Sequence, residues 1–214
     1  MVLPYSGACW QTIRLTSPRV DVVTEHTHAH ADGSIHAGTH EACALAHGDV
    51  PADVGPRTLV AVFANPVSSF LMHFARDAGF RTVLVEPDPA NVTDECAANA
   101  DGVASTVDPS FADGHADIVF CDHHRPELGD VMTDALAYPA RWIGVMGNAR
   151  DAGPHVEMLR DRGVPEDLIA TVHRPIGLNI GSKTPPEIAI STLAGLIADR
   201  NARPGGFDFP KPTS

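Results

Sequence analysis

The sequence predicts an α/β fold in which a doubly wound parallel sheet follows a small N-terminal segment. Residues 58–64 (TLVAVFA) form an apolar run of strand length, residues 66–78 read as a helix, and residues 81–85 form a second apolar run. This is a strand–helix–strand unit, which normally has right-handed connectivity and parallel strands. Two further apolar runs, residues 117–121 (DIVFC) and 141–147 (RWIGVMG), are spaced for more strands of the same sheet.

Local signals define the elements between these strands. The helix over 66–78 places Val67, Phe70, Leu71 and Phe74 on one face, and Gly79 suits the position just after its end. Residues 90–102 predict a short helix and turn, residues 102–106 an edge-like strand, and residues 127–136 another helix.

The last third of the chain predicts a strand, a helix, a turn-rich connection and a final capped helix. A helix opens at 148–150, and residues 163–165 stop it before a short turn. Residues 175–181 (PIGLNIG) are too rich in glycine for a regular element. Thr184 and Glu187 then form a capping-box pattern. The final helix carries an apolar stripe of Ile188, Ile190, Leu193, Leu196 and Ile197.

Size, charge and cysteine content limit the class of protein. A chain of 214 residues suits one domain with a small addition, and its net charge of -12 argues against binding to nucleic acid or an acidic membrane. We expect no membrane span and no signal peptide, because no apolar run has the length or flanks for either. The four scattered cysteines favour reduced thiols and a cytoplasmic location.

Residues 1–57 form a short, histidine-rich N-terminal segment. Six of the twelve histidines lie between His26 and His47. Clustered imidazoles suit zinc, copper or nickel, but a polar surface segment shows the same composition. We favour the surface segment and assign no metal ligands.

The turn after the first strand lacks the dinucleotide fingerprint. A Rossmann turn needs glycines so that the backbone approaches a pyrophosphate at the helix N-terminus. Phe63 and Asn65 stand at the glycine positions, and Pro66 removes an N–H donor. Glu86 ends the second strand, where an acid meets a ribose hydroxyl in such proteins. NAD(P) binding is therefore the less favoured alternative.

The carboxyl ends of two later strands carry polar residues suited to a ligand. Asp122, His123 and His124 follow the strand at 117–121, and ligands of doubly wound sheets bind at this edge. Gly147, Asn148 and Arg150 follow the next strand, where backbone N–H groups and a guanidinium suit a phosphate.

Residues 177–184 (GLNIGSKT) imitate a phosphate-binding loop of nucleotide hydrolases. Ser182 replaces the glycine before Lys183, and prolines follow Thr184 where the helix would begin. We reject ATP binding here, while Lys183 at a capped helix start remains a candidate anion contact.

Two segments in the last third resemble the XdhC/CoxI family. PARWIGVMGNAR is similar to that family's PARYIG–GSRRK pattern, and GVPEDLIATVHRPIGLNIGSKTPPEIAIST to GV–PE–L–A–H–PIGLDIGA–TPEEIA–SI. The resemblance predicts an XdhC-like Rossmann domain over 58–202 and a proline- and glycine-rich tail over 203–214. At 63–65 the family pattern LVIFGAGHVA has glycines where Phe63 and Asn65 stand. Residues 32–42 also resemble the glycine-rich turn of a CoxI-type domain, with Thr39 at the cysteine position, so residues 1–57 would be a reduced version of that domain.

The resemblance also implies a function. XdhC-like proteins are maturation factors that bind molybdenum cofactor (molybdopterin) and help deliver it to a xanthine dehydrogenase-type apo molybdenum hydroxylase. It implies a homodimer, a cofactor sulfurase as a further partner, and binding and transfer without catalysis. The candidate cofactor-binding residues are Arg150, Gly147, Asn148, His123, His124, Lys183, Asn65 and Glu86.

Three alternatives stay open. The first alternative is an NAD(P)-dependent Rossmann oxidoreductase, and the second is a histidine-rich metal-binding module. The third is a degenerate family member that keeps the fold as a scaffold without a ligand. The residues at positions 39, 63 and 65 favour the last of these among the alternatives.

Overall fold

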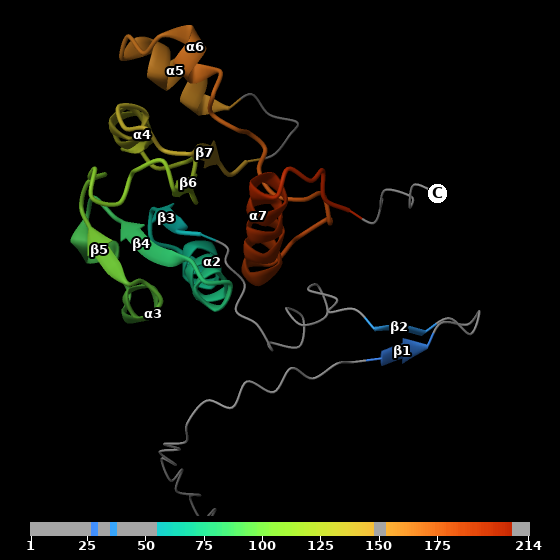
Figure 1. Ribbon diagram of the computed structural model, residues 1–214. Coiled ribbons are helices and arrows are strands. Elements are labelled where there is room, and N and C mark those ends of the chain that lie inside the picture. The colour runs from blue at the N-terminus through green and yellow to red at the C-terminus, as the bar shows by residue number, and fades with distance from the viewer. Residues whose placement is uncertain (1–26, 30–34, 38–54, 148–152, 207–214) are drawn as a thin grey trace, which may run out of the picture. The chain divides into compact units, whose positions relative to one another are not determined.

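The computed structural model describes residues 27–29, 35–37, 55–147 and 153–206 of the chain (Figure 1). The chain divides into two units, Met1–Asp53 and Val54–Ser214. In the first unit, β1 (Thr27–Ala29) pairs antiparallel with β2 (Ile35–Ala37), and His28 lies opposite His36. The predicted metal-binding alternative concerns mainly residues outside the described part of this unit.

The second unit contains a five-stranded sheet in which every pairing is parallel. The strand order is β5-β4-β3-β6-β7. The chain therefore runs outward from β3 to one edge, returns, and runs outward to the other edge, which is doubly wound topology. The predicted Rossmann-like α/β fold is confirmed. The strands are β3 (Thr58–Val62), β4 (Arg81–Val85), β5 (Gly102–Ala104), β6 (Ala116–Phe120) and β7 (Trp142–Val145).

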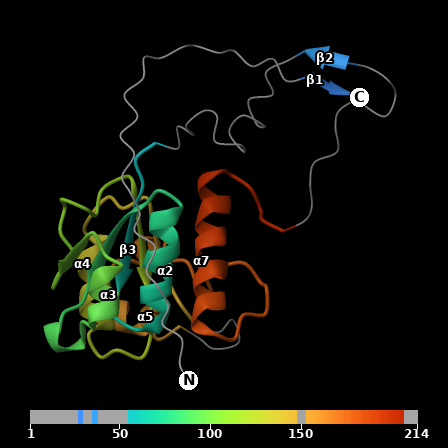
Figure 2. The same ribbon diagram turned by 90° about the horizontal axis from the view of Figure 1, so that it is seen from below.

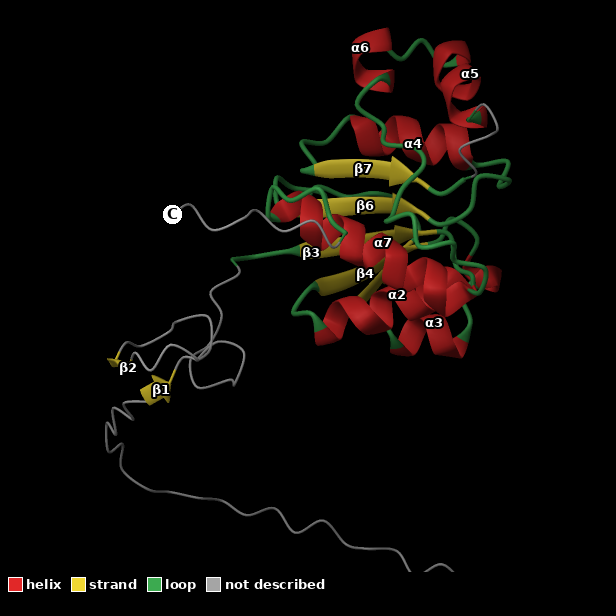
Figure 3. Ribbon diagram, turned by 90° about the vertical axis from the view of Figure 1, so that its right-hand side faces the viewer, coloured by secondary structure: helices red, strands yellow, loops and turns green. Residues whose placement is uncertain are grey.

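Helices cover both faces of this sheet (Figure 3). On one face α2 and α7 pack side by side, with α3 beyond α2 (Figure 2). On the other face α4 packs against α5, which contacts the short α6. The helices are α2 (Pro66–Asp77), the 3-10 helix η1 (Pro89–Asn91), α3 (Asp94–Ala98), α4 (Leu128–Leu136), α5 (Pro154–Asp161), α6 (Glu166–Ile169) and α7 (Pro185–Arg200).

Alternation along the strands creates two apolar cores. In β3, Val60 and Val62 face the α4 side, while Leu59 and Ala61 face the α2 and α7 side. Successive side chains of a strand point to opposite faces of the sheet. A run that is apolar at every position therefore suits a sheet that is covered by helices on both faces. The continuous apolar runs in the sequence record this double burial.

The strands expected over 58–64 and 102–106 end earlier, at residues 62 and 104, and larger differences lie in the last third of the chain. The strand expected over 141–147 is confined to 142–145, and the helix expected from residue 148 begins at Pro154, with residues 148–152 outside the described part. In α7, Ile190 is 50 % exposed, so it does not belong to the buried stripe. The buried face of α7, which packs against α2 and the sheet, is therefore narrower than the predicted stripe of five apolar residues.

Several local predictions are confirmed. Gly79 ends α2 with a φ of 79°, the left-handed region that favours glycine. The Glu187 carboxylate accepts hydrogen bonds from the N–H groups of Lys183 (2.8 Å) and Thr184 (3.1 Å), as a capping box requires. Residues 175–181 contain neither helix nor strand.

Among the described residues, no helix combines the length and the apolar character that a membrane crossing requires.

Candidate functional site

A hollow of about 620 Å³ lies at the carboxyl ends of β3, β6 and β7, against the first turns of α7. This is the edge at which doubly wound sheets bind ligands, and the volume suits a small organic molecule. We call it the sheet-edge hollow. Its polar lining residues are Asn65, Asp122, His123, His124, Ser182, Ser191 and Thr192, and the remaining lining residues are Val67, Cys121, Met146, Gly147, Ile176 and Ile188.

Asn65 closes the N-terminus of α2 and ties it to β6. Its Oδ1 accepts from the Ser68 N–H (2.9 Å), and the Ser68 Oγ accepts from the Asn65 N–H (2.9 Å). Its Nδ2 donates to the Cys121 carbonyl (3.1 Å). At this helix start Pro66 has no N–H group, and the N–H groups of Asn65 and Ser68 are bonded internally, so most of the donors that an anion would use are missing or engaged.

The segment after β6 presents two imidazoles at the rim. The Asp122 carboxylate accepts from the His124 N–H (2.8 Å), which fixes the turn. The rings of His123 and His124 lie 4.0 Å apart between centroids. Below them Cys121 is buried, and this burial raises the pKa of its thiol, so Cys121 is a neutral lining group and an unsuitable nucleophile.

The opposite wall consists of the irregular loop over 175–184 and α7. The Ser191 Oγ donates to the Leu178 carbonyl (2.6 Å), and the Leu178 N–H donates to the Ser191 carbonyl (3.0 Å). Gly177 has a φ of 85° and lies directly on α7, where a Cβ would come within 2.6 Å of the Ser191 Oγ. The glycines of this loop therefore let its backbone lie against the helix.

The Rossmann turn itself is filled by a side chain. Phe63 has a φ of 73°, which is strained for a residue with a Cβ, and its ring is fully buried. The ring packs edge-on against Phe120, with centroids 6.1 Å apart. The dinucleotide fingerprint has glycine at this position so that the backbone can approach a pyrophosphate, and Phe63 replaces that glycine.

Glu86 is also engaged internally. Its two oxygens accept from the Arg125 guanidinium (2.9 and 3.2 Å), and one of them also accepts from the Ala64 N–H (2.8 Å). Burial alone would raise the pKa of Glu86, but the hydrogen bonds from Arg125 and the backbone outweigh it and lower the pKa. The side chain of Glu86 has no exposed surface, so this carboxylate is not placed to meet a ribose hydroxyl.

The structure separates the predicted site residues into three groups. Asn65, His123, His124 and Gly147 come together in the sheet-edge hollow. Lys183 is exposed beside the lining residue Ser182 but does not line the hollow, and Glu86 lies buried away from it. Asn148 and Arg150, which follow Gly147, lie outside the described residues.

Sequence reasoning missed Arg125 and the buried hydroxyls of α7. Arg125 reads as an ordinary charged residue after two histidines, and nothing local predicts its reach to Glu86, 39 residues away. Ser191 and Thr192 interrupt the apolar stripe of α7 and are nonetheless buried. Two adjacent polar residues inside an otherwise apolar helix are a signal that a loop or ligand covers that face.

The lining of the hollow fits a polar heterocycle better than a metal or a bare phosphate. Its described lining residues include neither lysine nor arginine, and the described part of the chain contains no group of three or more side chains able to hold a metal ion. Carboxylate, hydroxyl, amide and imidazole groups above an apolar base suit a flat ring with donors and acceptors. For an anionic cofactor, positive charge would have to come from Lys183, from Arg174, whose guanidinium lies against the lining residue Gly147, or from residues outside the described part, such as Arg150.

These features define a Rossmann-like domain with a ligand hollow at the carboxyl edge of its sheet and a closed dinucleotide turn. The chain matches the XdhC Rossmann domain over residues 59–196. It therefore belongs to the XdhC family.

Two curated proteins and a solved structure are similar to it. The uncharacterized protein YqeB of Escherichia coli is 39% identical over 78 residues, which is 36% of this chain and 14% of that protein. A probable xanthine dehydrogenase subunit from Bacillus subtilis is 24% identical over 153 residues, or 69% of this chain and 44% of that protein. A crystal structure described as a xanthine dehydrogenase from Bacillus halodurans shares the fold, with a TM-score of 0.55 and 24% identity over 69% of this chain and 45% of that one. The chain thus spans less than half the length of each of these relatives.

Proposed function

We propose that this protein is an accessory factor for a xanthine dehydrogenase-type molybdenum hydroxylase, and that it binds molybdenum cofactor in the sheet-edge hollow and assists its insertion. Membership of the XdhC family and the relative described as a xanthine dehydrogenase subunit support the association with such an enzyme. The observation that carries the binding role is the hollow of about 620 Å³, lined by Asp122, His123, His124, Ser191 and Thr192.

In this proposal the residues bind and orient the cofactor without making or breaking bonds. The cofactor supplies a pterin ring, a phosphate and the molybdenum centre that the hydroxylase uses. Asp122, Ser182 and Thr192 donate to or accept from the ring, and Val67 and Ile188 pack on its face. Lys183 and Arg150 are the proposed contacts for the phosphate, because both flank the hollow in sequence and carry fixed positive charge.

The test is anaerobic equilibrium binding of molybdenum cofactor to the full chain, with NADH as a competitor. We expect saturable binding that Asp122→Ala, His124→Ala and Arg150→Ala each weaken about tenfold, since each removes a polar or charged contact. His73→Ala is the matched control, because His73 is an exposed histidine of α2 outside the hollow. NADH should not compete, because the Rossmann turn is filled.

Binding that is absent, or unchanged in all three variants, would reject the cofactor site. The second candidate function, a scaffold that has lost its ligand, is favoured by Phe63 and Asn65 at the glycine positions of the turn. It predicts no cofactor binding but retained binding to the apo-hydroxylase, which a pull-down with the purified enzyme measures. We also propose a cofactor sulfurase as a partner, a homodimer and a cytoplasmic location. The first two of these proposals rest on the resemblance to the XdhC family.

A further inference from the structure

The polar groups that line the sheet-edge hollow differ in how much hydrogen-bonding capacity they keep for a ligand. Asn65 keeps little, because its Oδ1 accepts from the Ser68 N–H and its Nδ2 donates to the Cys121 carbonyl. The Ser191 hydroxyl donates its proton to the Leu178 carbonyl. These two side chains hold the walls of the hollow together, so recognition of a ligand depends on the other polar lining groups.

Asp122 keeps most of its capacity. An ionised carboxylate has two lone pairs on each oxygen and no donor. Within the described part of the chain, the Asp122 carboxylate accepts one hydrogen bond, at Oδ1 from the His124 N–H (2.8 Å). The side chain is half-buried and lines the hollow. Asp122 therefore offers acceptor positions on both of its oxygens to a ligand.

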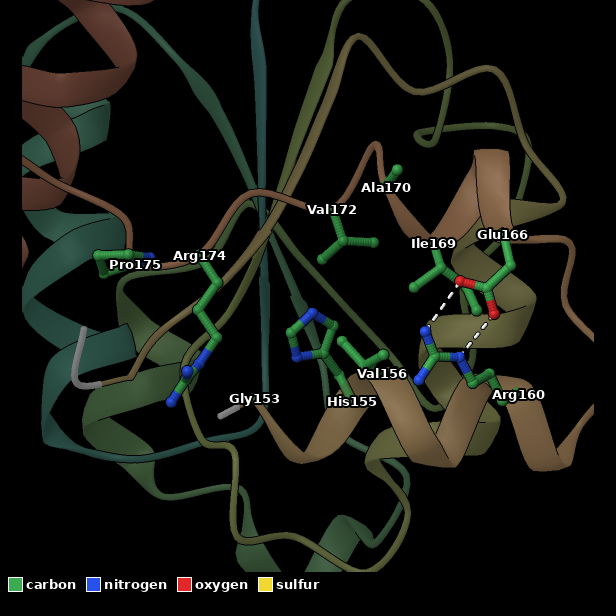
Figure 4. A pocket seen from close by; sticks show the side chains of 10 residues that line it. All are labelled: Gly153, His155, Val156, Arg160, Glu166, Ile169, Ala170, Val172, Arg174 and Pro175. Carbon is green, nitrogen blue, oxygen red and sulfur yellow. Dashed lines mark hydrogen bonds and ion pairs between the residues drawn. The ribbon is translucent and has the colours of Figure 1, made fainter. Parts of the chain in front are cut away.

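A carboxylate in another hollow of this domain is arranged differently. Beside α5, a hollow of about 380 Å³ is lined by residues that include Glu166 and Arg160 (Figure 4). Arg160 donates to both oxygens of Glu166, at 2.5 and 3.0 Å, so this carboxylate is engaged within the protein. The comparison shows that Asp122 differs from a lining carboxylate whose two oxygens already have a partner.

A buried hydroxyl lies on the α7 wall of the sheet-edge hollow. Thr192 is 2 % exposed and lines the hollow, and its hydroxyl makes no hydrogen bond to a described residue. A buried polar group without a protein partner normally has water or a ligand as its partner. A hydroxyl rotates and either donates or accepts, whereas a carboxylate only accepts. Thr192 therefore tolerates different ligand edges, and Asp122 is the group that discriminates between them.

We propose that Asp122 makes the sheet-edge hollow selective for a 2-amino-4-oxo pyrimidine ring, whose ring N–H and exocyclic amino group lie side by side on one edge. Two parallel N–H groups fit the two oxygens of one carboxylate, as they do in a bidentate arginine pair. This inference rests on the proposed function, in which the hollow holds the pterin of the cofactor. A 2,4-dioxo ring would instead place an oxygen against the carboxylate and leave both acceptors unpaired.

The test is calorimetric titration of the full chain with pterin and with lumazine, two bicyclic rings that carry an amino group and an oxo group, respectively, at the same position. We expect the wild type to bind pterin about 10- to 100-fold more tightly, as for a hydrogen bond to a charged group. Asp122→Asn keeps an oxygen for the His124 N–H and places an amide N–H donor at the second position, so the preference for pterin should disappear or reverse.

Glu166→Gln is the matched control, because it changes a carboxylate that lines the other hollow and should keep the wild-type preference. Retained lumazine binding in Asp122→Asn shows that this variant is folded. Equal affinity of the wild type for pterin and lumazine, or an unchanged preference in Asp122→Asn, would overturn the proposal even if molybdenum cofactor binds to the hollow. Cofactor binding without any binding of pterin would overturn it as well, since the ring edge would then contribute nothing.

Guanosine distinguishes the two sources of this ring, because guanine carries the same pair of N–H donors. Tighter binding of pterin than of guanosine supports a pterin as the ligand. Tighter binding of guanosine, again lost in Asp122→Asn, would support the selectivity of Asp122 and reject the proposed cofactor as the ligand of the hollow.

Discussion

The Arg125 guanidinium donates to both carboxylate oxygens of Glu86, at 2.9 and 3.2 Å, and so neutralises a side chain that has no exposed surface. The same guanidinium lies 4.8 Å from the centroid of the Phe63 ring. Three groups of this chain thus occupy the region where other Rossmann proteins receive a dinucleotide. An internal ion pair and a buried ring therefore lie at this turn.

Glu86→Gln should lower the free energy of unfolding by about 3 kcal/mol at neutral pH, because it leaves a half-buried guanidinium with one charged partner fewer. The folded-state pKa of Glu86 is lowered, so its contribution is present above its unfolded pKa of about 4.3 and is lost as pH falls through the folded value. The difference between wild type and variant should therefore shrink in acid. Urea unfolding across this pH range measures it.

Glu127→Gln is the matched control, since Glu127 pairs with the same guanidinium (3.2 Å) but its side chain is 36% exposed. We expect a loss of less than about 1 kcal/mol, as for other exposed ion pairs. Similar losses in both variants would contradict a special role for the buried carboxylate.

At position 63, the glycine variant should be more stable than the alanine variant, which is the reverse of the usual order of stability. Removing the ring costs about 3–5 kcal/mol in either variant, because it leaves a cavity beside Phe120. The φ of 73° costs a residue with a Cβ about 1–2 kcal/mol, and glycine avoids this cost. Phe63→Gly should therefore be more stable than Phe63→Ala by about 1 kcal/mol, although glycine in a regular position is the less stable of the two.

The free energies of unfolding of these two variants, measured in urea, decide the point. Phe63→Gly should also fail to bind NADH, because Asn65 and Pro66 still close the start of α2. Higher stability for Phe63→Ala would show that the backbone at residue 63 relaxes out of the left-handed region.

Much of the fold follows from the sequence because its signals are local. The apolar run at 58–64 is buried on both faces, Gly79 ends α2, and Glu187 caps the start of α7. Each depends on residues within a few positions of one another, which patterns of periodicity and capping describe. The exposed Ile190 departs from its pattern because tertiary packing, and not periodicity, decides which part of a helix is covered.

The site was predicted less completely, since long-range contacts form it. We expected ligands to bind at the carboxyl edge of the sheet. At this edge, one hollow is lined by Asn65, His123, His124 and Gly147. The role of Glu86 depends on its contact with Arg125, and the position of the Arg174 side chain depends on the space left by Gly147 and Gly153. These contacts exist only in the folded chain. An acid at the end of the second strand has the same sequence signature whether it meets a ribose or an internal arginine.

Asn65→Ala should cost about 1–2 kcal/mol, because it removes the cap of α2 and the hydrogen bond from Nδ2 to the Cys121 carbonyl. Asn65→Asp keeps an acceptor for the Ser68 N–H and places a negative charge at a helix N-terminus, but it loses the donor to Cys121. We expect its stability to lie between those of the wild type and Asn65→Ala in thermal unfolding. An alanine variant as stable as the wild type would show that the cap contributes nothing.

Gly195→Ala should destabilise the protein even though alanine is the better helix former. A Cβ at Gly195, inside α7, would lie 3.1 Å from the Gly177 Cα, and this neighbour is backbone that cannot rotate away. We expect a loss of about 1–3 kcal/mol from overpacking, where an open helical site would gain up to about 1 kcal/mol. Gly129→Ala in α4 is the matched control, because the three atoms nearest to its Cβ would all belong to the Arg162 guanidinium, the movable end of a partly exposed side chain. In urea unfolding, the free energy of unfolding should therefore fall for Gly195→Ala and rise for Gly129→Ala, each relative to the wild type. If Gly195→Ala gained stability as Gly129→Ala does, the loop carrying Ile176 would not be held against α7 by this contact, and that wall of the sheet-edge hollow would need another support.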